Sequence, residues 1–234
     1  MSSNFFSIIP ARIGSKGIPK KNLYPLLKKP LIQWTIEASL KSKYIYKTIV
    51  SSDSSEVLNL DANFEFIRHI RADELSDDTA RSEDVVLNII ENKAFLLDNY
   101  EYIVLLQPTS PLRTSLDIDK ACKKIIKNGT DSLISVKEIS NGVLKTLIEN
   151  SEGGLMTGFN KDFPFMPRQE LPKAYMPNGA IYISKISSFI ENRSFMSENN
   201  SFMLMDENSS IDIDTIEDIV QVEKLSKHIG KLKY

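Results

Sequence analysis

The stretch of sequence most suited to chemistry is residues 11–22, which follow an apolar run and carry two glycines, a serine and four cationic side chains. Glycines let backbone N–H groups approach phosphate oxygens closely, and cations offset phosphate charge. The spacing is neither that of a Walker A loop nor the Gly-x-Gly-x-x-Gly of a dinucleotide fold. Because open α/β sheets bind ligands beyond the carboxyl ends of their strands, the position favours a phosphate loop over the alternative, a solvated basic turn.

Two aspartates near the end of the sequence, Asp212 and Asp214, are candidates for metal binding. Residues two apart in an extended segment face the same side, so both carboxylates would converge on one hard cation. Magnesium prefers one or two carboxylates plus substrate phosphate oxygens, which suits a nucleotide-bound metal. The alternative is that Asp214 caps the last helix and Asp212 is a surface charge. Asp53 likewise is either another site carboxylate or a helix cap.

Arginine is scarce in this lysine-rich chain, and its positions suggest anion binding. Four of the seven arginines lie in loops after predicted strands or in a proline-rich stretch: Arg12, Arg71, Arg113 and Arg168. Arginine holds carboxylates and phosphates bidentately, which lysine does not. A substrate with phosphates and a carboxylate would explain this placement, although each arginine taken singly is also compatible with a solvated surface.

The elements that must position these residues alternate between strand-like and helix-like segments. Apolar runs rich in Ile, Val, Phe and Tyr predict strands at residues 5–10, 47–51, 64–69, 102–107, 131–136 and 178–184. Amphipathic spacing predicts helices at residues 31–41, 82–97 and 116–127, and a closing helix at 215–228 capped by Thr215. Residues 211–214 are predicted to be a short strand or turn. This alternation predicts an α/β fold with a mostly parallel sheet covered by helices on both faces.

Glycines and prolines interrupt this pattern between residues 139 and 177, which predicts an excursion from the sheet, such as a hairpin arm. The chain of 234 residues is long enough to bury a core without disulfides or structural metal. With 29 basic and 31 acidic side chains the net charge is −2, which argues against a nucleic-acid partner. One cysteine and two histidines cannot form a Cys/His zinc site. No run approaches a membrane span and the first ten residues lack a basic export signal, so we expect no membrane partner and a cytoplasmic location.

Together these motifs resemble the acylneuraminate cytidylyltransferase family, the CMP-sialic acid synthetases, in the family's order along nearly the whole chain. Six blocks carry the resemblance: residues 9–22, 50–54, 71–82, 105–113, 168–182 and 212–214. The family implies a three-layer Rossmann-like core of the nucleotide-diphospho-sugar transferase type, formed here by residues 1–138 and 178–234. It also implies that residues 139–177 are a dimerisation arm of a homodimer, packing over the partner's site.

The resemblance further implies that the enzyme couples CTP to the anomeric hydroxyl of a nine-carbon α-keto acid sugar, of the N-acetylneuraminic or legionaminic acid type, releasing pyrophosphate. It assigns the residues as follows: nucleotide binding to Ala11, Arg12, Ser15, Lys16, Lys21, Asn22, Arg71, Ala80 and Ser82; sugar binding to Gln107 and Arg168; Mg²⁺ to Asp212 and Asp214; and catalysis to Arg12, Lys21 and both aspartates.

The sequence departs from the family pattern at Ile13, where a second glycine is common, so the loop must avoid positive φ at that residue. Gly17 argues against the pseudaminic acid branch, which tends to carry arginine there, and Kdo cytidylyltransferases have a different loop. The base that accepts the sugar hydroxyl proton stays open between Asp212 and a water on the metal. The competing hypotheses are a nucleotidyltransferase for another sugar acid, a nucleotide-binding protein without turnover, and a scaffold protein.

Overall fold

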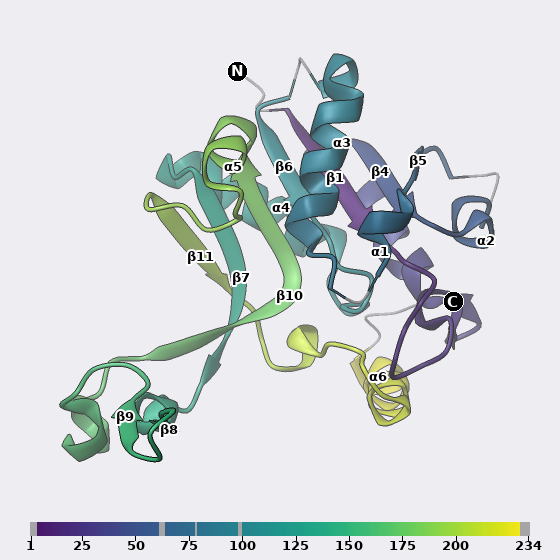
Figure 1. The fold of residues 1–234 in the computed structure, drawn as a ribbon. Helices are drawn as coiled ribbons and strands as arrows, with labels where there is room; N and C mark the ends of the chain where they lie inside the picture. The colour runs from purple at the N-terminus through teal and green to yellow at the C-terminus, as the bar shows by residue number, and fades with distance from the viewer. Residues whose placement is uncertain (1–3, 61–63, 78, 98–99, 230–234) are drawn as a thin grey trace.

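The centre of the molecule is a seven-stranded sheet, seen here in a computed structural model that describes residues 4–60, 64–77, 79–97 and 100–229. In spatial order the strands are β11 (Asn200–Leu204), β7 (Ser132–Ile139), β10 (Ala174–Lys185), β6 (Tyr102–Leu105), β1 (Phe5–Pro10), β4 (Ile45–Ser52) and β5 (Ile67–Ile70) (Figure 1). Only β10 runs antiparallel to its neighbours β6 and β7, and every other neighbouring pair is parallel. The predicted mostly parallel sheet is therefore confirmed.

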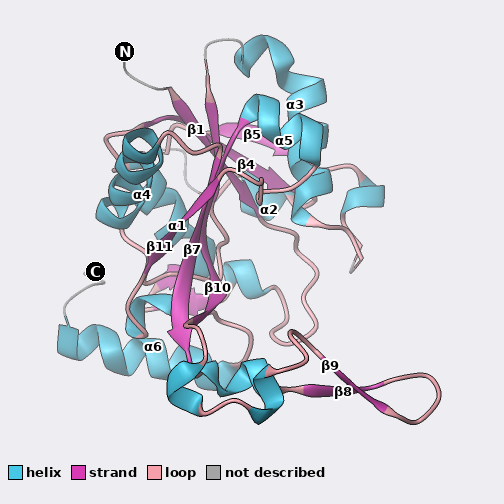
Figure 2. Ribbon diagram, turned by 90° about the vertical axis from the view of Figure 1, so that its left-hand side faces the viewer, coloured by secondary structure: helices cyan, strands magenta, loops and turns pink. Residues whose placement is uncertain are grey.

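Helices cover both faces of this sheet (Figure 2). They are α1 (Leu31–Leu40), α2 (Ser55–Leu58), α3 (Ser82–Leu97), α4 (Ser115–Asn128), α5 (Ile186–Asn192) and α6 (Ile216–Ile229). On one face, Ile36 of α1 and Ile118 of α4 pack with Ile9 of β1 in one buried cluster. On the other face, Val86 of α3 and Phe189 of α5 share a second cluster with strand residues. Because alternate residues of β1 enter the two clusters, this strand is apolar at successive positions and buried on both faces.

The local sequence signals place most element boundaries within a few residues of the structure. Helix α4 begins with a capping box, in which the Thr114 hydroxyl accepts from the Asp117 N–H, and ends at Gly129 with φ 64°. The predicted strand at 64–69 begins later, at Ile67, while the one at 178–184 begins earlier, at Ala174. Residues 211–214 form no strand, and α5 and β11 were not predicted.

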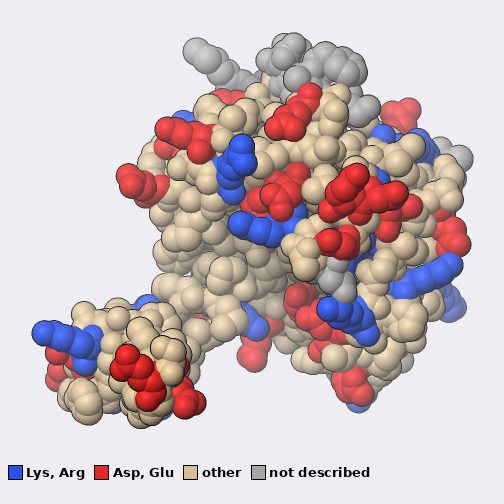
Figure 3. Space-filling model, in the orientation of Figure 1, with Lys and Arg blue, Asp and Glu red and all other residues tan. Residues whose placement is uncertain are grey.

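An arm leaves the body where β7 and β10 run on together beyond the sheet (Figures 1 and 2). At its end the chain forms short 3-10 turns and a hairpin of β8 (Leu147–Glu149) and β9 (Leu155–Thr157). The space-filling view shows this arm as a separate lobe (Figure 3). The predicted excursion, residues 139–177, includes the last residue of β7 and the first residues of β10.

A second small hairpin, β2 (Pro25–Leu26) with β3 (Lys29–Pro30), follows the predicted phosphate loop. Its Leu26 joins Ile213 and Val222 in a third buried cluster, which docks α6 and the segment preceding it beneath the loop. Among the helices of the described residues, none has the length and apolar character that crossing a bilayer requires.

Candidate functional site

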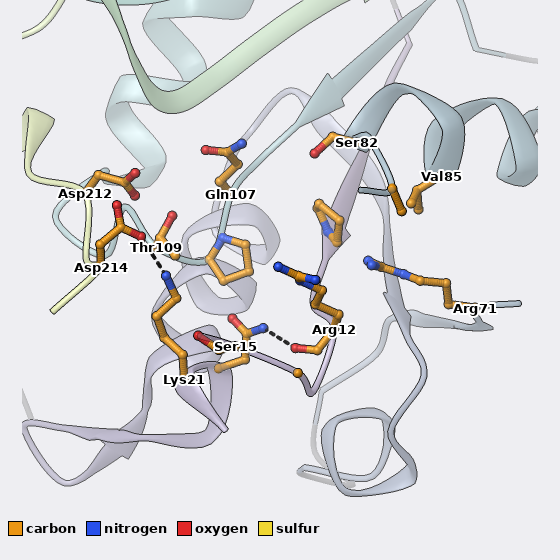
Figure 4. A pocket seen from close by; sticks show the side chains of 15 residues that line it. Arg12, Ser15, Lys21, Arg71, Ser82, Val85, Gln107, Thr109, Asp212 and Asp214 are labelled. Atoms are coloured by element: carbon orange, nitrogen blue, oxygen red, sulfur yellow. Dashed lines mark hydrogen bonds and ion pairs between the residues drawn. The ribbon is translucent and has the colours of Figure 1, made fainter. Parts of the chain in front are cut away.

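A polar cavity of about 300 Å³ lies at the carboxyl ends of β1 and β6 (Figure 4). This is the edge where ligands of open α/β sheets bind. Its walls are Pro10, Arg12, Gly14, Ser15, Lys21, Asn22, Arg71, Ala80, Ser82, Val85, Gln107, Pro108, Thr109, Asp212 and Asp214. Segments separated by about two hundred positions in the sequence thus meet around one space.

Ten of the thirteen residues assigned from the sequence line this cavity: Arg12, Ser15, Lys21, Asn22, Arg71, Ala80, Ser82, Gln107, Asp212 and Asp214. The other three do not. Ala11 is fully buried behind the wall and its N–H donates to the Ser51 carbonyl oxygen at 2.8 Å. Lys16 is exposed on the loop outside the cavity, and Arg168 is exposed on the arm, so a single chain does not bring Arg168 to this site.

Hydrogen bonds fix the start of the loop that forms the lower wall in Figure 4. The Asn22 side-chain amide donates to the Arg12 carbonyl oxygen at 2.8 Å, which folds the loop back on itself. The Ile13 N–H donates to Asp53 Oδ1 at 2.8 Å. Ile13 is not among the described residues with positive φ, as its β-branched side chain requires. Asp53 is not a helix cap, because the N-terminal cap position of α2 is Ser54 and no side chain makes a capping bond there.

The loop also touches the aspartate segment directly. A Cβ at Gly17 would overlap the Asp214 carbonyl oxygen, so glycine permits a close approach of the two backbones. Lys21 Nζ donates to the Ile213 carbonyl oxygen at 2.9 Å and pairs with Asp214 Oδ1 at 2.8 Å. These contacts hold the segment against the loop without any strand pairing.

Both aspartate side chains face the cavity because the residue between them is anchored on the other side. Ile213 is fully buried and its N–H donates to the Thr109 carbonyl oxygen at 2.8 Å. Asp212 and Asp214, one position before and after it, point to the same side (Figure 4). The Asp214 carboxylate pairs with Lys21, while the start of α6 is bonded by Asp218, whose Oδ2 accepts from the Thr215 N–H at 2.8 Å. Asp214 thus does not act as the helix cap.

The electrostatics of the aspartate pair suit a cation. Partial burial and the neighbouring Asp214 charge raise the pKa of Asp212, while a hydrogen bond from Thr109 and the charge of Lys21 oppose that rise. Among the described residues no group of three or more His, Cys, Asp or Glu side chains could hold a metal ion. Two carboxylates facing one polar cavity fit a magnesium ion that takes its remaining ligands from substrate and water.

Arg71 lies in the wall of the cavity farthest from the aspartates (Figure 4). It is 6% exposed, and its NH2 group donates to the Ser51 carbonyl oxygen at 3.2 Å. Its Nε is buried and has no hydrogen-bond partner among the described residues. Burial is the main cause that lowers the pKa of Arg71 to about 10. The charge of Asp53 opposes this decrease, and the charge of Arg12 adds to it. A buried guanidinium with an unused N–H is suited to bind a polar ligand.

A second, smaller cavity of about 200 Å³ adjoins the first, sharing Ser82 and Gln107 as walls. Its other walls combine polar and apolar side chains: Glu83, Leu105, Ile134, Tyr182, Ser194, Phe195 and Met196. The burial of Tyr182, with the charges of Asp212 and Glu83, raises the pKa of its hydroxyl. Of these residues only Ser82, Leu105, Gln107 and Tyr182 lie in motifs visible in the sequence.

Of the four arginines that the sequence suggested for anion binding, Arg113 has the position that fits this role least. Its side chain is 2% exposed and lies outside both cavities. It donates to the carbonyl oxygens of Gln107 and Ala180 at 3.1 and 3.0 Å and to the Thr35 hydroxyl at 2.6 Å. It is therefore structural, joining α1, β10 and the turn after β6. Thr109 was not singled out from the sequence, and Asp53 was predicted as either a site carboxylate or a helix cap, since the sequence does not show which groups these side chains contact.

Comparison with known proteins shows the family of this chain and the class of its fold. A family model described as cytidylyltransferase matches residues 6–153. The N-acylneuraminate cytidylyltransferase of Streptococcus agalactiae serotype III is 35% identical over 219 residues, which are 92% of this chain and 51% of that protein. The chain thus spans about half the length of that relative.

Relatives of matching length carry two further names. The CMP-N,N'-diacetyllegionaminic acid synthase of Legionella pneumophila is 34% identical, covering 94% of both chains. The pseudaminic acid cytidylyltransferase of Campylobacter jejuni is 32% identical, covering 91% of both. Among solved structures, a CMP:2-keto-3-deoxy-manno-octonic acid synthetase in complex with CTP has a TM-score of 0.70 at 15% identity, covering 97% of this chain and 99% of that one. That likeness confirms the Rossmann-like fold, and the family match with the two full-length relatives shows that this chain belongs to the cytidylyltransferase family.

Proposed function

We propose that the protein transfers CMP from CTP to a nine-carbon α-keto acid sugar, giving a CMP-sugar and pyrophosphate. The observation that carries this proposal is a single cavity lined by Arg12, Lys21 and two carboxylates, with Arg71 in its far wall. The names of the sequence relatives, which concern N-acylneuraminic, pseudaminic and legionaminic acids, support the class of sugar. Because the reaction consumes CTP, we also propose a cytoplasmic location.

In the proposed reaction the anomeric hydroxyl oxygen of the sugar attacks the α-phosphorus of CTP. A bond forms between them, the bond from the α-phosphorus to the bridging oxygen breaks, and pyrophosphate leaves with that electron pair. Arg12 and Lys21 stabilise the charge on the phosphates, and the loop from Gly14 to Ser15 offers its backbone to them. Asp212, whose side chain faces the cavity, is the protein group proposed to take the hydroxyl proton.

Asp212 and Asp214 are proposed to hold magnesium with the triphosphate, and when bound it would supply charge stabilisation at the phosphates. Lys21, which pairs with Asp214 in this structure, would then share that carboxylate with the metal. Asp212→Asn and Asp214→Asn test this assignment by the magnesium concentration needed for half-maximal rate. If both variants keep near-normal turnover at limiting magnesium, the assignment is wrong.

The adjoining cavity is the proposed place of the sugar. It shares Ser82 and Gln107 with the first cavity, so we propose that a sugar seated there meets the α-phosphate beside these two residues. Phe195 and Met196 provide apolar contacts, which suit an acyl substituent, and Tyr182 and Glu83 provide polar ones. Relatives for sialic, legionaminic and pseudaminic acids match at 32–35% identity, so the argument from Gly17 against pseudaminic acid stays a prediction.

We propose a homodimer joined through the arm. Large apolar side chains on the arm are unusually exposed: Leu155 by 70%, Phe159 by 58% and Phe165 by 86%. Apolar surface concentrated in this way marks an interface. Arg168 lies on the same arm, and in a dimer it would be available to the partner's cavity as the expected sugar-carboxylate ligand.

The decisive experiment is pyrophosphate release from the purified protein with CTP and magnesium, against a panel of nonulosonic acids. We expect release with CTP and one preferred sugar, and no release with UTP, GTP or ATP. Turnover with another nucleotide would replace the proposal with a different nucleotidyltransferase. CTP binding with no release across the panel would indicate a binding protein, and the absence of CTP binding would refute the proposal.

A further inference from the structure

The residue of the sequence motifs that the proposed function leaves unused is Asp53, which follows β4. It lines neither cavity, so it touches neither of the proposed substrates. Its side chain is half-buried and its Oδ1 accepts the hydrogen bond from the Ile13 N–H at 2.8 Å. It caps no helix and belongs to no cluster of metal-ligating side chains among the described residues.

The bond from Ile13 lies at the point where the loop stops being held by the sheet. Ala11 is still paired with β4 through its N–H, and the Ile13 side chain packs against the core. Gly14 and Ser15, the next two residues, line the cavity. Because Gly14 has open space around the position of a Cβ, no packing holds its backbone from that side. The bond to Asp53 thus holds the backbone immediately before the two loop residues that line the cavity.

Asp53 also acts electrostatically on an arginine of the cavity wall. Its charge favours the protonated form of Arg71, while the charge of Arg12 disfavours it. The same carboxylate therefore accepts a hydrogen bond from the loop backbone and stabilises the charged form of Arg71. A carboxylate near the loop would repel the negative charge of a triphosphate. Its presence there is explained if it serves to hold the loop.

We infer that Asp53 is a positioning residue for nucleotide binding, acting through the Ile13 N–H to fix the turn at Gly14 and Ser15 in the shape that receives phosphate. The inference rests on the proposed function, since it assigns Asp53 to the binding of CTP. The Asp53 side chain has two properties, a correctly placed acceptor oxygen and a negative charge. The acceptor oxygen is the one that holds the loop in shape. Asparagine can keep that oxygen without the charge, and glutamate keeps the charge but displaces the oxygen.

The test measures CTP dissociation constants by calorimetry, together with kcat and KM for CTP and thermal unfolding, for Asp53→Asn, Asp53→Glu and Asp53→Ala. We expect Asp53→Ala and Asp53→Glu to weaken CTP binding by at least about tenfold, the scale of a backbone donor left without its acceptor. We expect Asp53→Asn to stay within about threefold of wild type. The KM for the sugar should change little in all three.

Glu56→Ala is the matched control, because Glu56 also contacts the loop, through an exposed ion pair with Lys20 at 2.9 Å. Exposed pairs contribute little, so this variant should bind CTP as wild type does. The inference is overturned if Asp53→Ala unfolds earlier but binds CTP normally, which would make Asp53 merely structural. It is also overturned if Asp53→Asn is as impaired as Asp53→Ala, which would give the role to the charge. A wild type that binds no CTP would refute the proposed function first, and this inference with it.

Discussion

Replacing Arg113 should cost this protein a large part of its stability, although the residue touches no ligand. The side chain is 2% exposed, and no described carboxylate forms an ion pair with it. Burial lowers its pKa to about 9, with Asp117 opposing, so the guanidinium is still charged at neutral pH. In Arg113→Met the apolar volume is roughly kept while all five donors are removed.

The magnitude follows from the three acceptors that lose their donor, the Gln107 and Ala180 carbonyl oxygens and the Thr35 hydroxyl. Each buried acceptor left unsatisfied costs about 1–3 kcal/mol. The Thr35 hydroxyl already donates a long hydrogen bond of 3.5 Å to the Gln107 carbonyl oxygen, so this acceptor keeps part of its hydrogen bonding in the variant. The variant also avoids burying a charge, which recovers several kcal/mol. We expect a net loss of about 3 kcal/mol in the free energy of unfolding.

Thermal and urea unfolding followed by circular dichroism measure this loss. At about 2–4 °C per kcal/mol for a chain of this size, Tm should fall by roughly 6–12 °C. Arg113→Lys keeps a charge but cannot span three acceptors in a fork, so it should be destabilised nearly as much. An Arg113→Met protein with the wild-type Tm would refute the reasoning, because it would show that the buried network contributes nothing net.

Three further predictions concern the site and the arm. Gly17→Ala should reduce kcat/KM about a hundredfold, because the new Cβ forces the loop away from Asp214, and a displacement of about 1 Å in a reacting constellation costs that much. Thr109→Val removes the hydrogen bond that lowers the pKa of Asp212, so the acidic limb of the kcat/KM profile should move to higher pH. If the proposed dimer forms through the arm, Phe165→Glu, at an exposed apolar position there, should give a monomer in light scattering where the wild type gives a dimer.

Each of these predictions has a control within the chain. Gly14→Ala, with open space around its Cβ position, should keep more of the activity than Gly17→Ala, and equal losses would contradict the argument from close approach. Thr109→Ser keeps the hydroxyl and should leave the acidic limb in place; if valine leaves it in place too, Asp212 does not set that limb. Ile70→Glu changes an equally exposed residue on β5, away from the arm, and should not alter the oligomeric state. A Phe165→Glu protein that remains dimeric would remove Phe165 from the interface.

Patterns along the sequence were enough to predict the class of fold and most of the helices and strands. Apolar runs such as the one in β1 and a capping box such as Thr114 with Asp117 are local signals, because they depend on neighbouring positions along the chain. Strand β11 and helix α5 escaped prediction because their identity depends on packing: β11 completes the sheet beside β7, and α5 buries Phe189 against α3 and the strands.

The sequence also identified the residue types of the site, since glycines, cations and paired aspartates carry their chemistry with them. Which of these residues come together depends on how the chain folds in three dimensions. The buried Ile213, bonded to the Thr109 carbonyl oxygen, places Asp212 and Asp214 at the cavity, whereas Arg113 turns inward and Arg168 stays on the arm. This follows because a charged side chain can lie on a surface, in a polar cavity or, where enough hydrogen-bond acceptors surround it, in the core. Its neighbours in space, and not its neighbours in sequence, select among these places.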